Sequence, residues 1–394
     1  MFTVVHEGRE ADRLRELAQA WDAKTSFVLL PQPAPLAPGR LSQMLTHLPA
    51  GLHTDHFGLL TSGSTGTPKL VIGQKSRTAA LVAEIDRRQQ LAPVQAAVMA
   101  LPLSYSYGFV NQWLWAHLHR RRLIATAGLA DPAGLFDTLD REASAMLCLV
   151  GSQVPLLRGF VATGRQFPNV IRLNFAGGPF PQADLSWLEQ TFPDALIIHN
   201  FGCTEALPRL TIRPARACDD PRVLGPLVAG AEFSISDAGM LAFRSPYGAV
   251  AIADDDGARL IGAADWIETG DAAELIEAGA YRLLGRKSDV FKRFGEKISL
   301  ATLATSLREA WSGGLAFYLD PSDTGDPAHV LLLSPRPDND AMQKILRHLR
   351  AHFRRPFWPV RIEAAAEIPL SRNGKPDSEA IQLLSRDVLW KQRF

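Results

Sequence analysis

The segment 61–69 is the part of the sequence that most directly suggests a chemistry. It reads Thr-Ser-Gly-Ser-Thr-Gly-Thr-Pro-Lys and directly follows the apolar run 57–60. Its glycines give a flexible loop whose hydroxyl and backbone N–H groups can surround an anion, and Lys69 adds a charge suited to phosphate. It has neither the G-K-[ST] ending of a Walker loop nor the G-x-G-x-x-G of dinucleotide-binding folds. A Ser/Gly linker is the alternative, but linkers seldom lie between a buried strand and a lysine, so we predict a phosphate-binding loop.

Five further motifs follow this loop along the chain. They are Gly177-Gly178-Pro179-Phe180-Pro181, Asn200-Phe201-Gly202-Cys203-Thr204-Glu205, Thr269-Gly270-Asp271, Gly285-Arg286-Lys287-Ser288-Asp289 with Gly295 beyond it, and Asn373-Gly374-Lys375. Together with the loop they resemble, in the same order, the motifs of the adenylate-forming superfamily. That superfamily contains acyl- and aryl-CoA synthetases, adenylation domains of non-ribosomal peptide synthesis and firefly luciferase. One such triplet would occur by chance, whereas six in register would not.

The resemblance implies an AMP-forming acid–thiol ligase. A carboxylate would attack the α-phosphate of ATP to give an acyl-adenylate and pyrophosphate, and the thiol of CoA or of an acyl carrier protein would then take the acyl group and release AMP. Because the first step brings two anions together, the site needs cations and hydrogen-bond donors around the phosphates. The alternatives are an amino-acid adenylation protein and a non-catalytic adenylate-binding scaffold.

The resemblance also assigns roles to individual residues. Thr204 would contact the α-phosphate, Glu205 would bind Mg²⁺, and Lys375 would bridge the substrate carboxylate and the phosphate during adenylation. Asp271 would accept hydrogen bonds from the ribose, although an Asp after Thr-Gly is usually a turn residue. Arg286 would touch the same ribose. The β- and γ-phosphates would be held by Thr61, Ser62, Gly63, Ser64, Thr65, Gly66, Thr67 and Lys69, and the rest of the nucleotide by Gly178, Asn200, Phe201 and Gly202.

The acid pocket departs from the family pattern. The segment 102–108 resembles P-L-x-H-x-x-G, with Tyr105 in place of the histidine, and we expect Tyr105, Gly177 and Gly178 to line the pocket. There is no Asp between Leu101 and Trp115, where amino-acid adenylation domains place the partner of the α-ammonium. A buried, unpaired ammonium is costly, so an aryl or fatty acid is favoured over an amino acid.

The segment 344–361 is basic. It contains Lys344, Arg347, Arg350, Arg354, Arg355 and Arg361 and no acidic residue. The spacing predicts that Arg347, Arg350 and Arg354 share one face of a helix over 341–353. A solvated helix, a docking surface for an acidic acyl carrier protein and attraction of CoA phosphates are the three interpretations. Nucleic acid is disfavoured because no aromatic platform accompanies the patch.

The pattern of apolar runs predicts an α/β fold. Strand-sized runs alternate with helical segments such as 76–91 and 133–143 from residue 57 onward, which is typical of mostly parallel, layered sheets. These runs lie at 57–60, 97–101, 123–127, 145–150, 170–176 and 195–201. After about residue 225, frequent Gly and Pro predict a small antiparallel, barrel-like part. We expect a large domain over 1–285, a hinge over 286–289 centred on Ser288, and a small, mobile α+β domain over 290–394.

Length and composition set the outer limits. The chain has 394 residues, 46% of them hydrophobic, and a net charge of +1, which exclude a disordered or collagenous chain and give no overall attraction to nucleic acid. Three scattered cysteines offer neither a disulfide framework nor a zinc site. We see no signal peptide or membrane span and expect a cytoplasmic protein. The stretch before the loop is short for the family, which suggests a shortened N-terminal part and a homodimer or docked partner.

Overall fold

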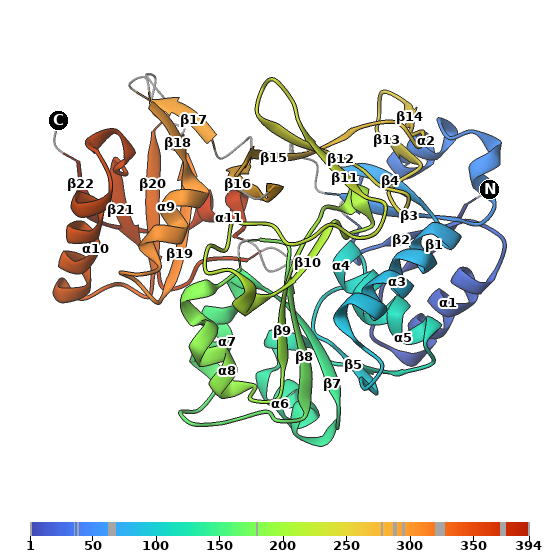
Figure 1. Cartoon of the computed structure of the whole chain (residues 1–394), viewed down its shortest axis with the longest axis horizontal. Coiled ribbons are helices and arrows are strands. Elements are labelled where there is room, and N and C mark those ends of the chain that lie inside the picture. Colours follow the sequence, from blue (N-terminus) through green and yellow to red (C-terminus); the bar gives the residue numbers. More distant parts are fainter. Residues whose placement is uncertain are drawn as a thin grey trace.

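The computed structural model describes residues 2–34, 36–37, 39–61, 68–178, 180–276, 279–286, 290–293, 296–319, 328–370 and 376–392. Two six-stranded sheets form the larger part of the molecule (Figure 1). The first has the order β1 (Thr3–His6), β2 (Phe27–Leu30), β3 (His56–Thr61), β4 (Lys69–Gln74), β13 (Ala251–Ala253) and β14 (Ala258–Leu260). The second has the order β10 (Thr211–Pro214), β9 (Leu196–Phe201), β8 (Val170–Ala176), β7 (Ala145–Val150), β5 (Ala96–Met99) and β6 (Arg122–Ala125).

Most neighbouring strands in these two sheets are parallel, as the sequence predicts. The run β1-β2-β3 is parallel, and so are the pairs that join β6, β5, β7, β8 and β9. Antiparallel pairing occurs at β3–β4, at β4–β13–β14 and at β9–β10. The connection from β3 to β4 is too short for a crossover, so these two strands must run in opposite directions.

Strand β7 shows why a continuous apolar run becomes a central strand. All six of its residues are buried. Met146, Cys148 and Val150 belong to one core cluster, while Leu147 and Leu149 belong to another. Because successive side chains of a strand point to opposite faces, both faces of this sheet must be covered.

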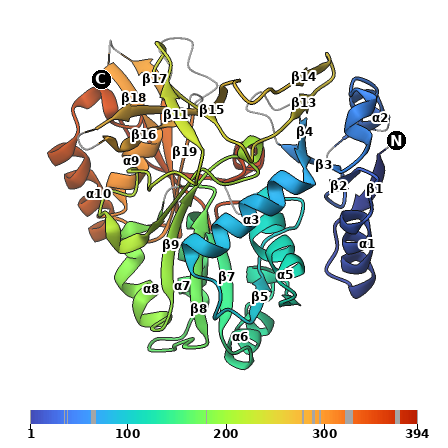
Figure 2. The ribbon, with the colours of Figure 1, turned by 45° about the vertical axis from the view of Figure 1, so that its right-hand side comes forward.

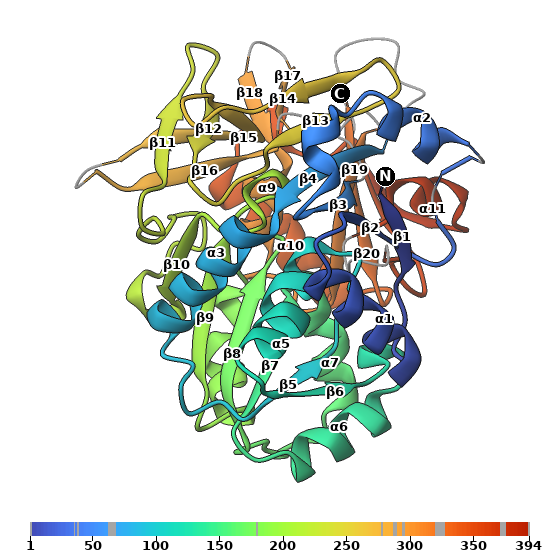
Figure 3. The same ribbon diagram turned by 90° about the vertical axis from the view of Figure 1, so that its right-hand side faces the viewer.

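Helices provide that cover. Between the two sheets lie α3 (Lys75–Gln89) and a continuous helical segment made of α4 (Ser106–Gly108), η2 (Phe109–Leu114) and α5 (Trp115–Leu118) (Figure 2). The outer face of the second sheet packs on α6 (Pro132–Arg141), α7 (Val154–Phe160) and α8 (Leu185–Thr191). The first sheet is flanked by α1 (Ala11–Asp22) and α2 (Arg40–Thr46), as the view in Figure 3 shows. The remaining short helices of this part are η1 (Ala50–His53), η3 (Gly128–Ala130), η4 (Gly151–Gln153), η5 (Gln182–Asp184), η6 (Thr204–Ala206) and η7 (Ala215–Ala217).

The third sheet has four antiparallel strands, which confirms the antiparallel part that the sequence predicts after about residue 225. Its order is β11 (Glu232–Ile235), β12 (Met240–Arg244), β15 (Ile267–Leu275) and β16 (Tyr281–Arg286). In Figure 1 this sheet lies above the carboxyl ends of β8 and β9.

The C-terminal part has its own sheets and its own core. A hairpin of β17 (Val290–Arg293) and β18 (Glu296–Ser299) precedes a sheet of β19 (Gly314–Leu319), β20 (His329–Ser334), β21 (Arg361–Ala364) and β22 (Asp387–Lys391). The helices are α9 (Leu300–Leu307), α10 (Asn339–His352), η10 (Arg355–Phe357) and α11 (Ser378–Leu383). Three core clusters consist of residues from this part alone, which confirms the predicted α+β fold. The hinge residue Ser288 lies outside the described residues, and movement about it stays a prediction.

The predicted helix over 341–353 is α10, but it ends at His352. Arg354 therefore lies beyond the helix and does not share its face with Arg347 and Arg350, because the chain leaves helical geometry at Phe353. Among the described residues, no helix is both long enough and apolar enough to cross a membrane.

Candidate active site

A cleft of about 1490 Å³ opens at the carboxyl ends of β7, β8 and β9. Open α/β sheets place their ligand sites at this edge. The turns that follow these three strands supply Ser152, Gly177 and Thr204 to the cleft wall. The antiparallel sheet closes the cleft from one side, and Thr305 and Pro376 reach it from the C-terminal part.

The predicted phosphate loop begins and ends at this cleft. Thr61 and Lys69 face each other across the β3–β4 ladder and both line the cleft. Lys69 Nζ lies 3.7 Å from Asp254 Oδ2, and both side chains are partly exposed. Ser62, Gly63, Ser64, Thr65, Gly66 and Thr67 lie outside the described residues, so their predicted contacts with phosphate remain predictions.

Thr204 and Glu205 lie on the tight turn after β9. The turn needs a glycine at 202, because a Cβ there would lie 1.8 Å from the carbonyl oxygen of Pro208. The Glu205 carbonyl accepts a hydrogen bond from Ala249 N at 2.8 Å, which fixes the backbone of the turn. The Thr204 and Ser106 hydroxyls are 3.1 Å apart. A carboxylate and a hydroxyl on one turn are the hard oxygen ligands that Mg²⁺ prefers, so the residues present fit the predicted ion.

Asp271 and Arg286, both predicted to meet the ribose, form a pair with each other. They are register partners on β15 and β16, and Arg286 Nε lies 3.0 Å from Asp271 Oδ1. Arg286 Nη1 also donates to the carbonyl of Thr269 at 3.0 Å. Gly270, which lies between Thr269 and Asp271 in the motif, has a φ of +79°, a backbone conformation that favours glycine. The T-G-D motif therefore forms part of the cleft wall and is held to Arg286 by an ion pair and a hydrogen bond.

Asn200 is held in a buried row of side-chain amides. Its Oδ1 accepts from Gln89 Nε2 at 2.9 Å, and its Nδ2 donates to Asn174 Oδ1 at 3.2 Å. The row ties α3 to β8 and β9 behind the cleft, which gives Asn200 a structural function that the sequence did not indicate. Its predicted role toward the nucleotide remains a prediction. Its neighbour Phe201 is half-buried in the cleft wall and packs edge-to-face on Phe233, with ring centroids 6.3 Å apart.

The three residues predicted for the acid pocket lie together. A Cβ at Gly177 would lie 2.0 Å from Tyr105 Oη, and Gly177 has a φ of +77°. Gly178, beside it, has open space where a Cβ would be. Burial raises the pKa of Tyr105 to about 12, so its hydroxyl remains a neutral donor at physiological pH.

The sequence did not indicate a buried charged group, Arg209, which lies next to the cleft residue Tyr107. Arg209 is completely buried, and its guanidinium lies 5.4 Å from the ring centroid of Tyr107. Arg209 Nη2 donates to Asn111 Oδ1 at 2.8 Å. The available signal was a single charged residue within the apolar stretch 206–212.

Two predicted features belong to the C-terminal part. Lys375 lies outside the described residues. In the basic segment, Lys344, Arg347 and Arg350 on α10 are exposed, whereas Arg361 is half-buried and pairs with Glu363 at 2.9 Å. A shallow hollow of about 500 Å³ adjoins this surface and is lined by Arg350, Arg355, Trp358, Leu389, Trp390, Lys391 and Gln392.

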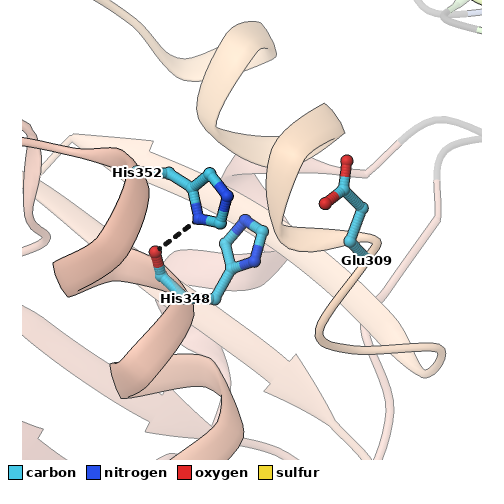
Figure 4. A group of neighbouring side chains, drawn as sticks. All are labelled: Glu309, His348 and His352. Carbon is cyan, nitrogen blue, oxygen red and sulfur yellow. Dashed lines mark hydrogen bonds between the residues drawn. The ribbon is translucent and has the colours of Figure 1, made fainter.

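A cluster of histidines lies apart from the cleft, at the contact of α9 with α10 (Figure 4). The rings of His348 and His352 stack with centroids 4.2 Å apart, and Glu309 is near them. His348 Nε2 is 2.7 Å from Ser306 Oγ, and His352 Nδ1 is 3.0 Å from the His348 carbonyl. These contacts give the cluster a packing role between the two helices.

The sequence and the fold are both similar to known proteins. The family model described as AMP-binding enzyme matches residues 19–253. The chain is 25% identical over 357 residues to the fatty acid–[acyl-carrier-protein] ligase MmaC of Mycobacterium marinum, covering 80% of this chain and 66% of that protein. It is 26% identical over 340 residues to an anthranilate–CoA ligase of Pseudomonas aeruginosa, covering 80% and 64% respectively. The chain thus spans about two thirds, or slightly less, of each of these relatives.

Solved structures share the fold at low sequence identity. O-succinylbenzoate coenzyme A synthetase of Bacillus subtilis, in complex with AMP, superimposes with a TM-score of 0.68 at 13% identity, covering 96% of this chain and 87% of that one. The amide bond synthetase McbA of Marinactinospora thermotolerans superimposes with a TM-score of 0.70 at 17% identity, covering 96% and 83%.

Proposed function

This chain belongs to the AMP-binding enzyme family, and thus to the adenylate-forming superfamily, and we propose that it is an AMP-forming ligase that joins a carboxylic acid to a thiol. One observation carries the proposal. A single cleft is lined by Thr204 and Glu205, by the Asp271–Arg286 pair and by the glycines at 177 and 178. These groups come from four separate segments of the sequence. They provide hydrogen-bond donors, a carboxylate that can bind a cation, and open space beside the glycines.

In the proposed first half-reaction, a carboxylate oxygen bonds to the α-phosphorus of ATP, and the bond from that phosphorus to the β-phosphate oxygen breaks. Pyrophosphate leaves with the electron pair. Thr204 donates to the α-phosphate, and Lys69 with the loop 61–67 neutralises the leaving phosphates. Glu205 would hold Mg²⁺, which offsets phosphate charge when bound. Asp271 and Arg286 orient the ribose.

In the proposed second half-reaction, a thiol loses its proton to solvent water and its sulfur bonds to the acyl carbon. The bond from that carbon to the phosphate oxygen breaks, and AMP leaves with the electron pair. Between the two steps we expect the unit 290–394 to turn about the hinge 286–289 on the domain 1–285. That turn would bring Lys375 to the cleft for adenylation and withdraw it for thiol entry.

We propose an aryl or fatty acid as the substrate class. The relatives named above act, by their names, on a fatty acid and on anthranilate. In this chain the apolar side chains of Phe109, Trp113 and Trp115 are in the core and leave the pocket wall to Tyr105 and Tyr107. No acidic residue lies between 101 and 115 to pair with an α-ammonium, which disfavours the alternative of an amino-acid adenylation protein.

For the acceptor we propose the phosphopantetheine thiol of an acyl carrier protein, with CoA as the second candidate. The exposed cations of α10 would attract an acidic partner, and acyl carrier proteins are acidic. The relative MmaC is named for such an acceptor.

Exchange of labelled pyrophosphate into ATP, measured across a panel of aryl and fatty acids, tests the proposal. We expect acid-dependent and Mg²⁺-dependent exchange, followed by thioester formation when CoA or holo-carrier protein is added. Absence of exchange with every acid would support the alternative of a non-catalytic adenylate-binding protein.

A further inference from the structure

The contact between α9 and α10 brings three side chains that can bind a metal close together, apart from the cleft (Figure 4). His348 and His352 lie four residues apart on α10, so they share one face of that helix. Glu309 belongs to the turn that follows α9. One ligand atom from each of the three residues lies within 4.8 Å of the other two. None of the three residues lines the cleft, so the proposed ligase chemistry does not use them.

Each imidazole has one nitrogen engaged by an oxygen of the protein. His352 Nδ1 lies 3.0 Å from the carbonyl oxygen of His348. A carbonyl oxygen can only accept, so His352 Nδ1 carries the proton and its Nε2 keeps a lone pair. His348 Nε2 lies 2.7 Å from Ser306 Oγ, and when Nε2 donates to that hydroxyl the lone pair is on Nδ1. Histidines that bind metals are usually oriented in this way, by a hydrogen bond from the second ring nitrogen.

The surroundings of the cluster favour a neutral imidazole that can bind a cation. The two histidine rings stack with centroids 4.2 Å apart, so protonation of both rings would bring two positive charges together. Burial and the neighbouring His352 lower the pKa of His348, Glu309 raises it in part, and Lys344 lowers it. The net lowering of the pKa keeps His348 neutral at physiological pH, as a metal ligand must be. Glu309 is exposed, and its carboxylate makes no hydrogen bond or ion pair within the described part of the chain.

Another histidine–carboxylate pair of the chain lacks these features. His117 Nε2 lies 2.9 Å from Asp22 Oδ1, and the His117 ring stacks on Trp113 rather than on a second imidazole. No third ligand joins this pair among the residues that the structure describes. The combination of two imidazoles and a carboxylate is therefore a local property of the contact between α9 and α10.

We propose that Glu309, His348 and His352, beyond packing α9 against α10, form a binding site for a divalent transition-metal ion such as Zn²⁺. Two imidazole nitrogens and one carboxylate oxygen suit Zn²⁺ and disfavour Mg²⁺, which prefers oxygen ligands alone. Ligand atoms around tetrahedral Zn²⁺ are about 3.5 Å apart, so rotation of the exposed His352 and Glu309 side chains must close the spacing by about 1 Å. Water completes the coordination. The bound ion links α10 to the end of α9 and so stabilises the C-terminal part.

Calorimetric titration of the full chain, without an affinity tag and depleted of metal, with ZnCl₂ tests the inference. For the wild type we expect one equivalent to bind with a micromolar or lower Kd and to remain bound in a large excess of Mg²⁺. His352→Gln and Glu309→Gln should each weaken this binding about tenfold or more, because each removes one ligand. The matched control His117→Gln removes a histidine beside a carboxylate elsewhere and should leave the affinity unchanged.

A second measurement is the melting temperature with and without Zn²⁺. Zn²⁺ should raise it in the wild type and not in His352→Gln, because an ion that binds only the folded chain stabilises that chain. Melting in EDTA checks that the variants fold, and if one of them does not, the other carries the test. No saturable binding by the wild type, or an affinity unchanged in the folded variants, would overturn the site. An equal loss in His117→Gln would also overturn it, because it would indicate unspecific binding to histidines.

Discussion

The hydroxyl of Ser106 lies 3.1 Å from that of Thr204. Ser106 begins the helical segment that carries Tyr107 and directly follows the acid-pocket residue Tyr105, and Thr204 begins the turn that we assign to the α-phosphate. In the proposed reaction, this contact would couple the position of the acid to that of the nucleotide, which an in-line attack requires.

We expect Ser106→Ala to lower the rate of pyrophosphate exchange about two- to tenfold, the effect of losing one hydrogen bond of about 0.5–1.5 kcal/mol. Thr204→Val should lower it further, because that change also removes the donor proposed for the α-phosphate. Stopped-flow or isotope-exchange rates at saturating ATP measure both effects. Equal rates for wild type and Ser106→Ala would show that the contact does not position the reactants.

The Asp271–Arg286 pair gives a prediction about affinity for ATP. Asp271→Asn should raise the KM for ATP about tenfold and lower the melting temperature only slightly, because the amide keeps the shape of the buried Asp271 side chain and one acceptor oxygen for Arg286, which is itself partly exposed. Glu274→Gln is the matched control, since Glu274 pairs with Arg282 at 3.0 Å in the same ladder and neither residue lines the cleft. A similar rise in KM in both variants would contradict the ribose role.

Gly177 and Tyr105 make a testable steric pair. Gly177→Ala should lower stability by about 2–4 kcal/mol, from a positive φ and from overlap with the Tyr105 hydroxyl. Tyr105→Phe should recover part of that loss in the double variant, because only the hydroxyl overlaps severely. Gly178→Ala, where a Cβ meets open space, should leave the melting temperature unchanged. Denaturant unfolding of the wild type, Gly177→Ala, Tyr105→Phe and the double variant measures the coupling between the two residues. Strictly additive losses of unfolding free energy would show that the Gly177→Ala methyl group and the Tyr105 hydroxyl do not collide.

Much of this architecture could be predicted from the sequence. The predicted apolar runs 145–150 and 170–176 coincide with the bounds of β7 and β8, because a strand that is covered on both faces needs a nearly continuous apolar run. The motifs also identify Thr204, Asp271 and Gly177, which the structure brings together in one cleft. The partners could not be named, because the Asp271–Arg286 pair and the Ser106–Thr204 contact depend on register and on the packing of elements distant in sequence.

The buried polar interactions were the least predictable. Neither the amide row through Asn200 nor the site of Arg209 has a local signature, since each joins residues 26 to 111 positions apart. Hydrophobic periodicity reports which face of an element is buried, but it does not report which buried polar groups will meet.

Two buried histidines predict loss of stability in acid. Burial lowers the pKa of His199 to about 3 and that of His329 to about 4. The unfolded chain takes up these protons near pH 6.5 and the folded chain does not, so stability falls as the pH drops from 6.5 toward 4. Each histidine should contribute a loss of about 2 kcal/mol at pH 5. Unfolding free energies at pH 5 and pH 8 measure this, and His329→Gln should show a smaller difference than the wild type. An unchanged difference in that variant would mean that His329 is protonated in the fold.

The exposed cations of α10 give the last prediction, which separates the two half-reactions. Arg347 and Arg350 are exposed on α10, and their removal leaves the cleft itself intact because neither residue lines it. Reversing both, in Arg347→Glu with Arg350→Glu, should slow thioester formation with holo-carrier protein about tenfold or more, because electrostatic steering acts on association. Adenylate formation, measured by pyrophosphate exchange, should change less than twofold. The control Arg141→Glu makes the same kind of charge change at the end of α6 and should affect neither step. Equal losses in both half-reactions would refute a docking role, and a selective loss with CoA as well as with the carrier protein would assign these cations to CoA phosphates instead.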